Sequence, residues 1–412
     1  MTDLSVDARL LTREPDRNLA VNRGAVLVAL ALLVFGTLAL AQAISWRQGA
    51  LYLLGGALGV TLYHALFGFT SAWRVFISDR RGAGLRAQMV MLAVAVLLFY
   101  PVLGHGMLFG RHVHGEFGAV GIGMLSGAFM FGLGMQLGGG CASGTLYTAG
   151  GGNTRMLVTL AAFVAGSALG AKHLPWWGAL PNIGKVDLVS SLGWAGALAV
   201  SLAIVGAIYL FTLVAERRYH GQLIAGPETQ HRGLRRALQG PWPLVVGAVL
   251  LALFNFATLY LAGRPWGITS GFALWGSKIL AAAGADVASW PYWQGARAAS
   301  LHASVFRDIT SVMDFGIIVG ALLAAGLAGK FKPEWKLPAR SLLAAIIGGL
   351  LLGYGARLAY GCNIGAYFSG IASGSLHGWA WLAAAFLGGI LGTRLRPLFG
   401  LTVEHTARLT AC

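Results

Sequence analysis

The sequence predicts an all-α polytopic membrane protein made of two inverted-topology repeats, with short re-entrant helices meeting at a central cysteine-lined pore, like an hourglass. Three observations predict this fold. Of the 412 residues, 57% are hydrophobic and only 11% are charged, which is not the composition of a soluble domain. Apolar stretches of about 18 or more residues recur along the chain. Cys141 and Cys362 each lie in a run of small and polar residues beside such stretches.

Ten apolar stretches predict the membrane-spanning helices, with boundaries good to a few residues. They cover residues 24–44, 49–69, 87–104, 118–137, 156–170, 194–215, 243–262, 313–329, 341–359 and 378–392. An eleventh stretch, residues 271–284, is too short to cross a bilayer and predicts a re-entrant helix.

Lysine and arginine are concentrated in three of the connecting segments, residues 74–86, 216–240 and 330–340. Because positive residues favour the cytoplasmic side, these segments and both termini are predicted to lie in the cytoplasm, with the protein in the inner membrane. The net charge of +16 is spread over such loops, so no nucleic-acid partner is predicted. The predicted organisation is a cytoplasmic leader (1–23), a first repeat half (24–215), a basic cytoplasmic linker (216–240), a second repeat half (241–397) and a C-terminal tail (398–412).

Three pairs of matching segments predict the internal repeat. Residues 160–175 (LAAFVAGSALGAKHLP) match residues 382–397 (LAAAFLGGILGTRLRP) in their glycine, basic and proline positions. A Gly-x-Gly precedes Cys141 and Cys362 at equal distance, and the Thr-Ser pair of residues 70–71 recurs at residues 269–270. The predicted loop positions place one cysteine after an inward-running helix and the other after an outward-running helix. The two halves are therefore predicted to be inverted.

The segments around the two cysteines predict a substrate site. Irregular backbone at membrane depth is tolerated where it is buried in protein or lines a cavity. A thiol is a soft, polarizable partner for a ligand with exposed sulfur, and glycine N–H groups with neutral side-chain donors can bind an anion. Arg357 is the only strongly basic residue that the sequence places near either cysteine. The predicted substrate residues are Cys141, Cys362, Gly140, Ser143, Gly144, Thr145, Gly361, Asn363, Gly365, Tyr367, Thr70, Ser71, Thr269, Ser270 and Arg357.

Other roles for the cysteines stay open at this point. Each could be a small packing residue or a soft metal ligand, but no histidine, Cys-x-x-Cys or methionine cluster accompanies them, so no metal is predicted. No local base would activate a nucleophile, so neither a catalytic residue nor a cofactor is predicted. An alternative is a membrane sulfurtransfer or redox protein that carries persulfide on a cysteine. Asp308 and Asp314 could bind a coupling ion or a proton, but they flank a predicted span and are interpreted as structural.

The two cysteine motifs, the paired Thr-Ser elements and the inverted arrangement resemble the YeeE/YedE family of bacterial sulfur-transport membrane proteins, and GCNIGAYFSGIASGSLHGW (residues 361–379) is a specific signature of that family. The resemblance covers residues 51 to 397. It implies a transporter in which thiosulfate, a related sulfur-bearing anion or a selenium analogue passes inward between Cys141 and Cys362. The predicted partners are this anion, the lipid bilayer and a cytoplasmic sulfur-carrier protein. Family members that take up thiosulfate carry a further cysteine near the N-terminal pore helix, and this sequence has none there.

Overall fold

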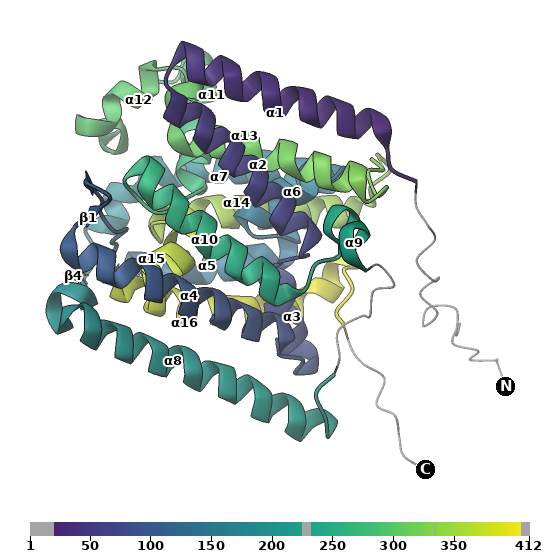
Figure 1. Ribbon diagram of the computed structural model, residues 1–412. Coiled ribbons are helices and arrows are strands. Elements are labelled where there is room, and N and C mark those ends of the chain that lie inside the picture. The colour runs from purple at the N-terminus through teal and green to yellow at the C-terminus, as the bar shows by residue number, and fades with distance from the viewer. Residues whose placement is uncertain (1–19, 225–231, 334, 405–412) are drawn as a thin grey trace.

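Helices make up most of the computed structural model, which describes residues 20–224, 232–333 and 335–404 (Figure 1). The helices are α1 (Arg23–Ala43), α2 (Trp46–His64), α3 (Phe69–Asp79), α4 (Ala83–His105), α5 (Ile122–Gly138), α6 (Ala142–Gly150), α7 (Thr154–Gly178), α8 (Leu188–His220), α9 (Gly233–Gln239), α10 (Leu244–Ala262), α11 (Thr269–Ala282), α12 (Ala298–His302), α13 (Ile309–Leu327), α14 (Ala339–Leu358), the π-helical η5 (Asn363–Phe368), α15 (Ser369–Ala372) and α16 (Leu376–Leu395). Much of the predicted leader, part of the predicted linker, most of the predicted tail and Cys412 lie outside the described residues.

Ten helical stretches within the described residues are long and apolar enough to cross a membrane. Each contains most of one stretch predicted from the sequence, so the polytopic, helical prediction is confirmed. The short stretch around residue 275 forms α11 and is not among the ten, as its length predicted.

Two local features differ from the prediction. The span predicted to end at residue 69 ends at His64, and a separate helix, α3, occupies part of what was expected to be a basic loop. The chain turns between them through Leu66, which has a positive φ of 49°. Four short strands also occur, β1 (Met107–Leu108) paired with β2 (Arg111–His112) and β3 (Ala119–Gly121) paired with β4 (Asn182–Lys185).

Four helices, α5, α7, α14 and α16, form the centre of the molecule, with α5 packed against α14 and α16 and α14 packed against α7. Glycine allows their backbones to touch. A Cβ atom on Gly132 would collide with the carbonyl oxygen of Ala385, and one on Gly353 would collide with that of Phe163. Close packing through small residues is typical of helices in a bilayer. The same explanation applies to the glycines that the sequence analysis did not assign to the site, Gly166, Gly170, Gly388 and Gly392.

The two ends of the bundle carry different elements. The strands β1 and β4 and the helix α12 lie at one end, and α9 lies at the other (Figure 1). The long helices run between these ends (Figure 1), and the short helices α3, α6, α11 and η5 with α15 pack against them. Half-length helices of this kind place their termini inside the bundle, where a site can form.

Candidate functional site

Cys141 is the N-cap residue of α6 and is almost completely buried. Its Sγ accepts a hydrogen bond from the backbone N–H of Gly144 at 3.4 Å and lies 3.4 Å from Oγ of Ser143. The Thr145 hydroxyl donates to the carbonyl oxygen of Cys141 at 2.8 Å. The sulfur therefore lies at the positive end of a short helix, with predicted site residues in the same turn.

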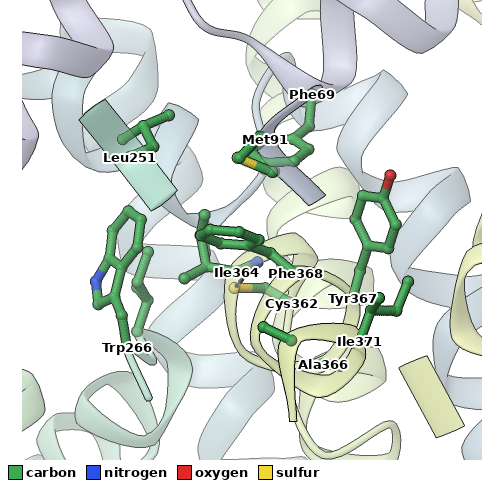
Figure 2. Packing of buried hydrophobic residues seen from close by; sticks show 14 of the residues in the cluster. Phe69, Met91, Leu251, Trp266, Cys362, Ile364, Ala366, Tyr367, Phe368 and Ile371 are labelled. Atoms are coloured by element: carbon green, nitrogen blue, oxygen red, sulfur yellow. Dashed lines mark hydrogen bonds between the residues drawn. The ribbon is translucent and has the colours of Figure 1, made fainter. Parts of the chain in front are cut away.

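Cys362 occupies the same position in the other polar segment, as the N-cap of η5. Its Sγ accepts from the backbone N–H of Ile364 at 3.4 Å (Figure 2). Gly361 before it has to be small, because a Cβ atom there would lie 2.7 Å from the backbone nitrogen of Ala366. The turns η5 and α6 contact each other, so the two cysteine segments meet in the core of the molecule.

Several predicted site residues carry buried polar atoms without a hydrogen-bond partner among the described residues. They are both amide atoms of Asn363, the hydroxyl of Tyr367 and the hydroxyl of Thr70. Buried polar groups are nearly always paired, and a group left unpaired costs about 1–3 kcal/mol. These atoms are therefore available to a ligand or to water, which is the property that a substrate site needs.

The two Thr-Ser pairs lie at the starts of two short helices. Thr70 and Ser71 belong to the first turn of α3, and Thr269 and Ser270 to the first turn of α11. Ser71 donates to the carbonyl oxygen of Gly68 at 3.2 Å, and Ser270 donates to the hydroxyl of Thr310 at 2.9 Å.

A cavity adjoins each Thr-Ser pair. The first, which we call the arginine vestibule, has a volume of about 170 Å³ and is lined by Thr269, Ser270, Gly361 and Gly365, and by Arg264, Arg297, Arg357, Glu116, Tyr292 and Tyr360 among others. The second, which we call the apolar vestibule, has a volume of about 220 Å³ and is lined by Gly68 and Ser71, and by Leu66, Val75, Arg81, Gln88 and Leu244 among others. Neither cysteine lines either cavity, so the thiols are enclosed in this conformation.

The sequence analysis missed two of the three arginines in the arginine vestibule. It named Arg357 alone, whereas Arg264 and Arg297 line the same cavity as Arg357. Arg357 donates to the hydroxyl of Tyr292 at 2.7 Å, and Arg297 lies over the Tyr292 ring. Arg264 stands two residues before the motif WGITSGF, a signal that could have been used, whereas Arg297 comes from a distant loop.

Gly140, Gly144 and Tyr367, three further residues of the predicted site, pack tightly against their neighbours. Gly140 is tightly enclosed, because a Cβ there would lie 3.1 Å from the backbone nitrogen of Thr145, and one on Gly144 would lie 3.5 Å from the Cys141 sulfur. Tyr367 packs edge-to-face against Phe69, which extends the cysteine segment to α3. A search of the described residues finds no group of three or more histidine, cysteine or acidic side chains that could hold a metal ion.

A family model described as sulphur transport matches residues 64–391. The chain belongs to this sulphur transport family. Its helices and its family make it a multi-pass membrane protein of a transport family, and the names of its relatives indicate transport rather than catalysis.

Two kinds of transporter are found among the relatives of this chain. The chain is 34% identical over 166 residues to the probable transporter YedE of Escherichia coli (strain K12), a match that spans only 40% of either protein. It is 28% identical to the thiosulfate transporter TsuA of Spirochaeta thermophila, over 82% of this chain and 95% of that protein. It is 25% identical to TsuA of Escherichia coli (strain K12), over 82% of this chain and 90% of that protein.

Proposed function

We propose that this protein imports thiosulfate across the inner membrane, passing the ion between the thiols of Cys141 and Cys362. The observation that carries the proposal is the pair of buried cysteines, each capping a short helix in the core, beside buried donors that have no partner among the described residues. A soft sulfur atom on the ion suits contact with sulfur, and neutral donors suit its oxygens. The similarity to TsuA over most of both chains supports the same substrate.

The glycine contacts support two inverted repeats. Gly132 meets the carbonyl of Ala385, and Gly353 meets that of Phe163. The predicted alignment pairs Gly132 with Gly353 and Phe163 with Ala385, so one contact is the image of the other. In many transporters, two repeats are related by a two-fold axis in the membrane plane, and the substrate site lies between them at the midplane.

The two vestibules support a path for the ion. In the predicted orientation the arginine vestibule opens to the outside, where its charges attract anions. The ion then passes Gly361 and Gly365, which line that vestibule, reaches the thiols, and leaves through the apolar vestibule beside Gly68 and Ser71. A cytoplasmic sulfur-carrier protein is the proposed acceptor.

Uptake of labelled thiosulfate into proteoliposomes tests the proposal. Cys141→Ala and Cys362→Ala should each abolish uptake while leaving the protein folded, because losing one buried sulfur costs only about 1 kcal/mol. Cys412→Ala, which falls outside the described residues, should leave uptake unchanged. Normal transport by both buried-site variants would make these cysteines packing residues.

Competition by sulfate tests the role of soft sulfur. Sulfate has a similar shape and charge but no exposed sulfur for a thiol to contact. Excess sulfate should therefore inhibit labelled uptake far less than excess unlabelled thiosulfate does. Equal inhibition by the two ions would contradict the soft-sulfur mechanism.

A further inference from the structure

Asp314 is a buried acid that the proposed thiosulfate path does not use. It lies in the second turn of α13, its side chain is fully buried, and neither carboxylate oxygen has a hydrogen-bond partner among the described residues. Enclosing a carboxylate ion with neither donor nor cation is very unfavourable. Acidic groups inside membrane spans commonly belong to proton relays.

The immediate neighbours of Asp314 do not satisfy it. Ser311, one turn earlier, donates to Asp308 at 2.6 Å and accepts from the indole nitrogen of Trp275 at 2.8 Å. On the facing helix α11, Gly271 provides space, since a Cβ atom there would lie 3.0 Å from Oδ2 of Asp314. The carboxyl group therefore stands against the backbone at the start of α11, beside the Thr269–Ser270 turn.

Hydroxyl groups bonded to residues of the arginine vestibule reach to within about one helical turn of this carboxyl group. Thr310 lies one turn before Asp314 on the same face of α13. Its hydroxyl accepts from Ser270 at 2.9 Å and from Arg264 at 3.0 Å, and both of those residues line the vestibule. A proton entering from the vestibule has to travel about one helical turn to reach Asp314.

Charged and titratable groups lie on every element that packs against α13. Asp308, on the same helix, and Cys362, on η5, interact electrostatically with Asp314. On α11, Lys278 donates to the carbonyl oxygens of Leu301 and Ala303. The other elements packed on α13 carry titratable groups as follows: Arg23 on α1; Arg47, Tyr52, Tyr63 and His64 on α2; Tyr147 on α6, with Cys141 as its cap; Arg235 and Arg236 on α9; and Arg307 on the short helix η4 (Val305–Arg307). At the level of Asp314, α2 meets α13 through Gly55 and Gly59.

We propose that Asp314 takes up a proton from the arginine vestibule and releases it to the cytoplasmic side, so that each anion enters together with a proton. The proposal rests on the proposed transport of thiosulfate. A carboxylate whose charge acts on Cys362 repels an anion that approaches the thiol, and the neutral acid does not. The step forms one O–H bond on the carboxylate with a proton from water in the vestibule, and release to water breaks that bond. No oxidation or reduction takes place.

Proteoliposomes that enclose a pH-sensitive dye, supplied with labelled thiosulfate outside, test this coupling. In the wild type, thiosulfate entry should acidify the lumen, and uptake should rise with external acidity by up to about tenfold per pH unit. Asp314→Asn should still take up label along its gradient, without acidifying the lumen and with a flat pH profile. Asp286→Asn, at an exposed acid beyond the end of α11, is the control and should keep both the wild-type acidification and the wild-type pH profile.

The outcomes separate this inference from the transport proposal. Labelled uptake by the wild type without acidification, or wild-type acidification by Asp314→Asn, would overturn the role of Asp314 and leave transport standing. Absence of any labelled uptake by the wild type would overturn both. If Asp314→Asn does not fold, Asp314→Glu tests the same inference. This variant should retain acidification of the lumen with a displaced pH profile. An undisplaced profile would overturn the inference.

Discussion

Backbone N–H groups hold the two sulfur atoms, while the arginines stand apart in the vestibule. Weak, neutral donors suit a narrow passage, because an ion that must leave again cannot be bound too tightly. Fixed positive charge suits the entrance, where it raises the local concentration of anions. In the proposed path, capture and passage therefore belong to different residues, which the sequence analysis, with Arg357 as its single cation, did not separate.

Removing charge from the arginine vestibule should slow capture more than passage. We expect Arg264→Gln and Arg357→Gln each to raise the KM for thiosulfate by about tenfold at low salt, the lower end of the effect of electrostatic steering. The effect should shrink as salt screens the field. Initial uptake rates over a range of ionic strength measure it, with Arg340→Gln, an exposed basic residue at the start of α14, as the control. A fall in maximal rate with unchanged KM would instead assign these arginines to the passage.

At the scale of elements, short helices supply the site and glycine contacts fix the long helices around them. Residues in one short motif could be predicted from the sequence: Asn363 and Tyr367 lie beside Cys362 in the chain, and the structure finds their polar atoms buried without partners among the described residues. Arg297 could not be predicted, because it reaches the vestibule from a separate loop. The helix α3 was missed because its apolar residues continue the pattern of α2, and only the turn at Leu66 separates the two.

Substituting a glycine at a backbone contact should disrupt the central helices. Gly132→Leu places a side chain where the Ala385 carbonyl lies, and overpacking of this kind costs about 1–3 kcal/mol or more. We expect a clear loss of thermal stability and of folded yield, measured in detergent by thermal unfolding. Gly206→Ala on α8 is the matched control: a Cβ there meets nothing within 4 Å, and alanine favours a helix by about 0.5–1 kcal/mol. Equal stability of Gly132→Leu and the wild type would refute the contact.

The segment after α16 is attached to α3 by an ion pair between Arg74 and Glu404, with Nε–Oε2 at 2.7 Å. Burial by itself raises the pKa of Glu404, but hydrogen bonds and charge from Arg74 outweigh it, so the pKa lies below its ordinary value. A lowered folded pKa gives stability that is present above the unfolded pKa and lost as pH falls through the folded one.

We therefore expect this attachment to loosen in acid. Hydrogen exchange of residues 400–404 should accelerate as pH falls below the ordinary glutamate range, after correction for the intrinsic exchange rate. In Arg74→Gln the same residues should exchange fast already at neutral pH. A wild-type segment equally protected at acid and neutral pH would show that the ion pair does not hold it.

At the scale of the whole molecule, the separation of the two ends makes the predicted orientation testable. Cysteines introduced at the exposed positions Arg80, Gln222 and Trp335 should react with a membrane-impermeant reagent only from the cytoplasm, because the segments around them are rich in positive charge. Phe109 and Ile183, exposed near β1 and in β4, should react only from outside. Reaction of any of the first three from outside would contradict the orientation and the proposed direction of the path.

Length and hydropathy were sufficient to predict the ten spans, because a bilayer demands about 20 apolar residues wherever a helix crosses it. The same argument predicted α11 as too short. The helices pack closely where glycine leaves room for a neighbouring helix. The glycines at residues 166, 170, 388 and 392 mark such contacts in the sequence. The burial of Asp314 could not be predicted from the sequence. Asp314 lies one residue inside the predicted start of its span, and it is buried because Gly271 and the start of α11 pack against it.

The backbone contacts among α5, α7, α14 and α16 also restrict motion. Where a carbonyl lies against a glycine, sliding one helix by a single residue would press a side chain into that carbonyl, so these four helices form a fixed frame. Rocking one half of the protein against the other would have to break this frame in every cycle. Opening and closing is then left to displacements of about the size of one side chain in α3, α6, α11 and η5. A protein that works in this way resembles a narrow gated channel, whose turnover depends little on the thickness or fluidity of the surrounding lipid.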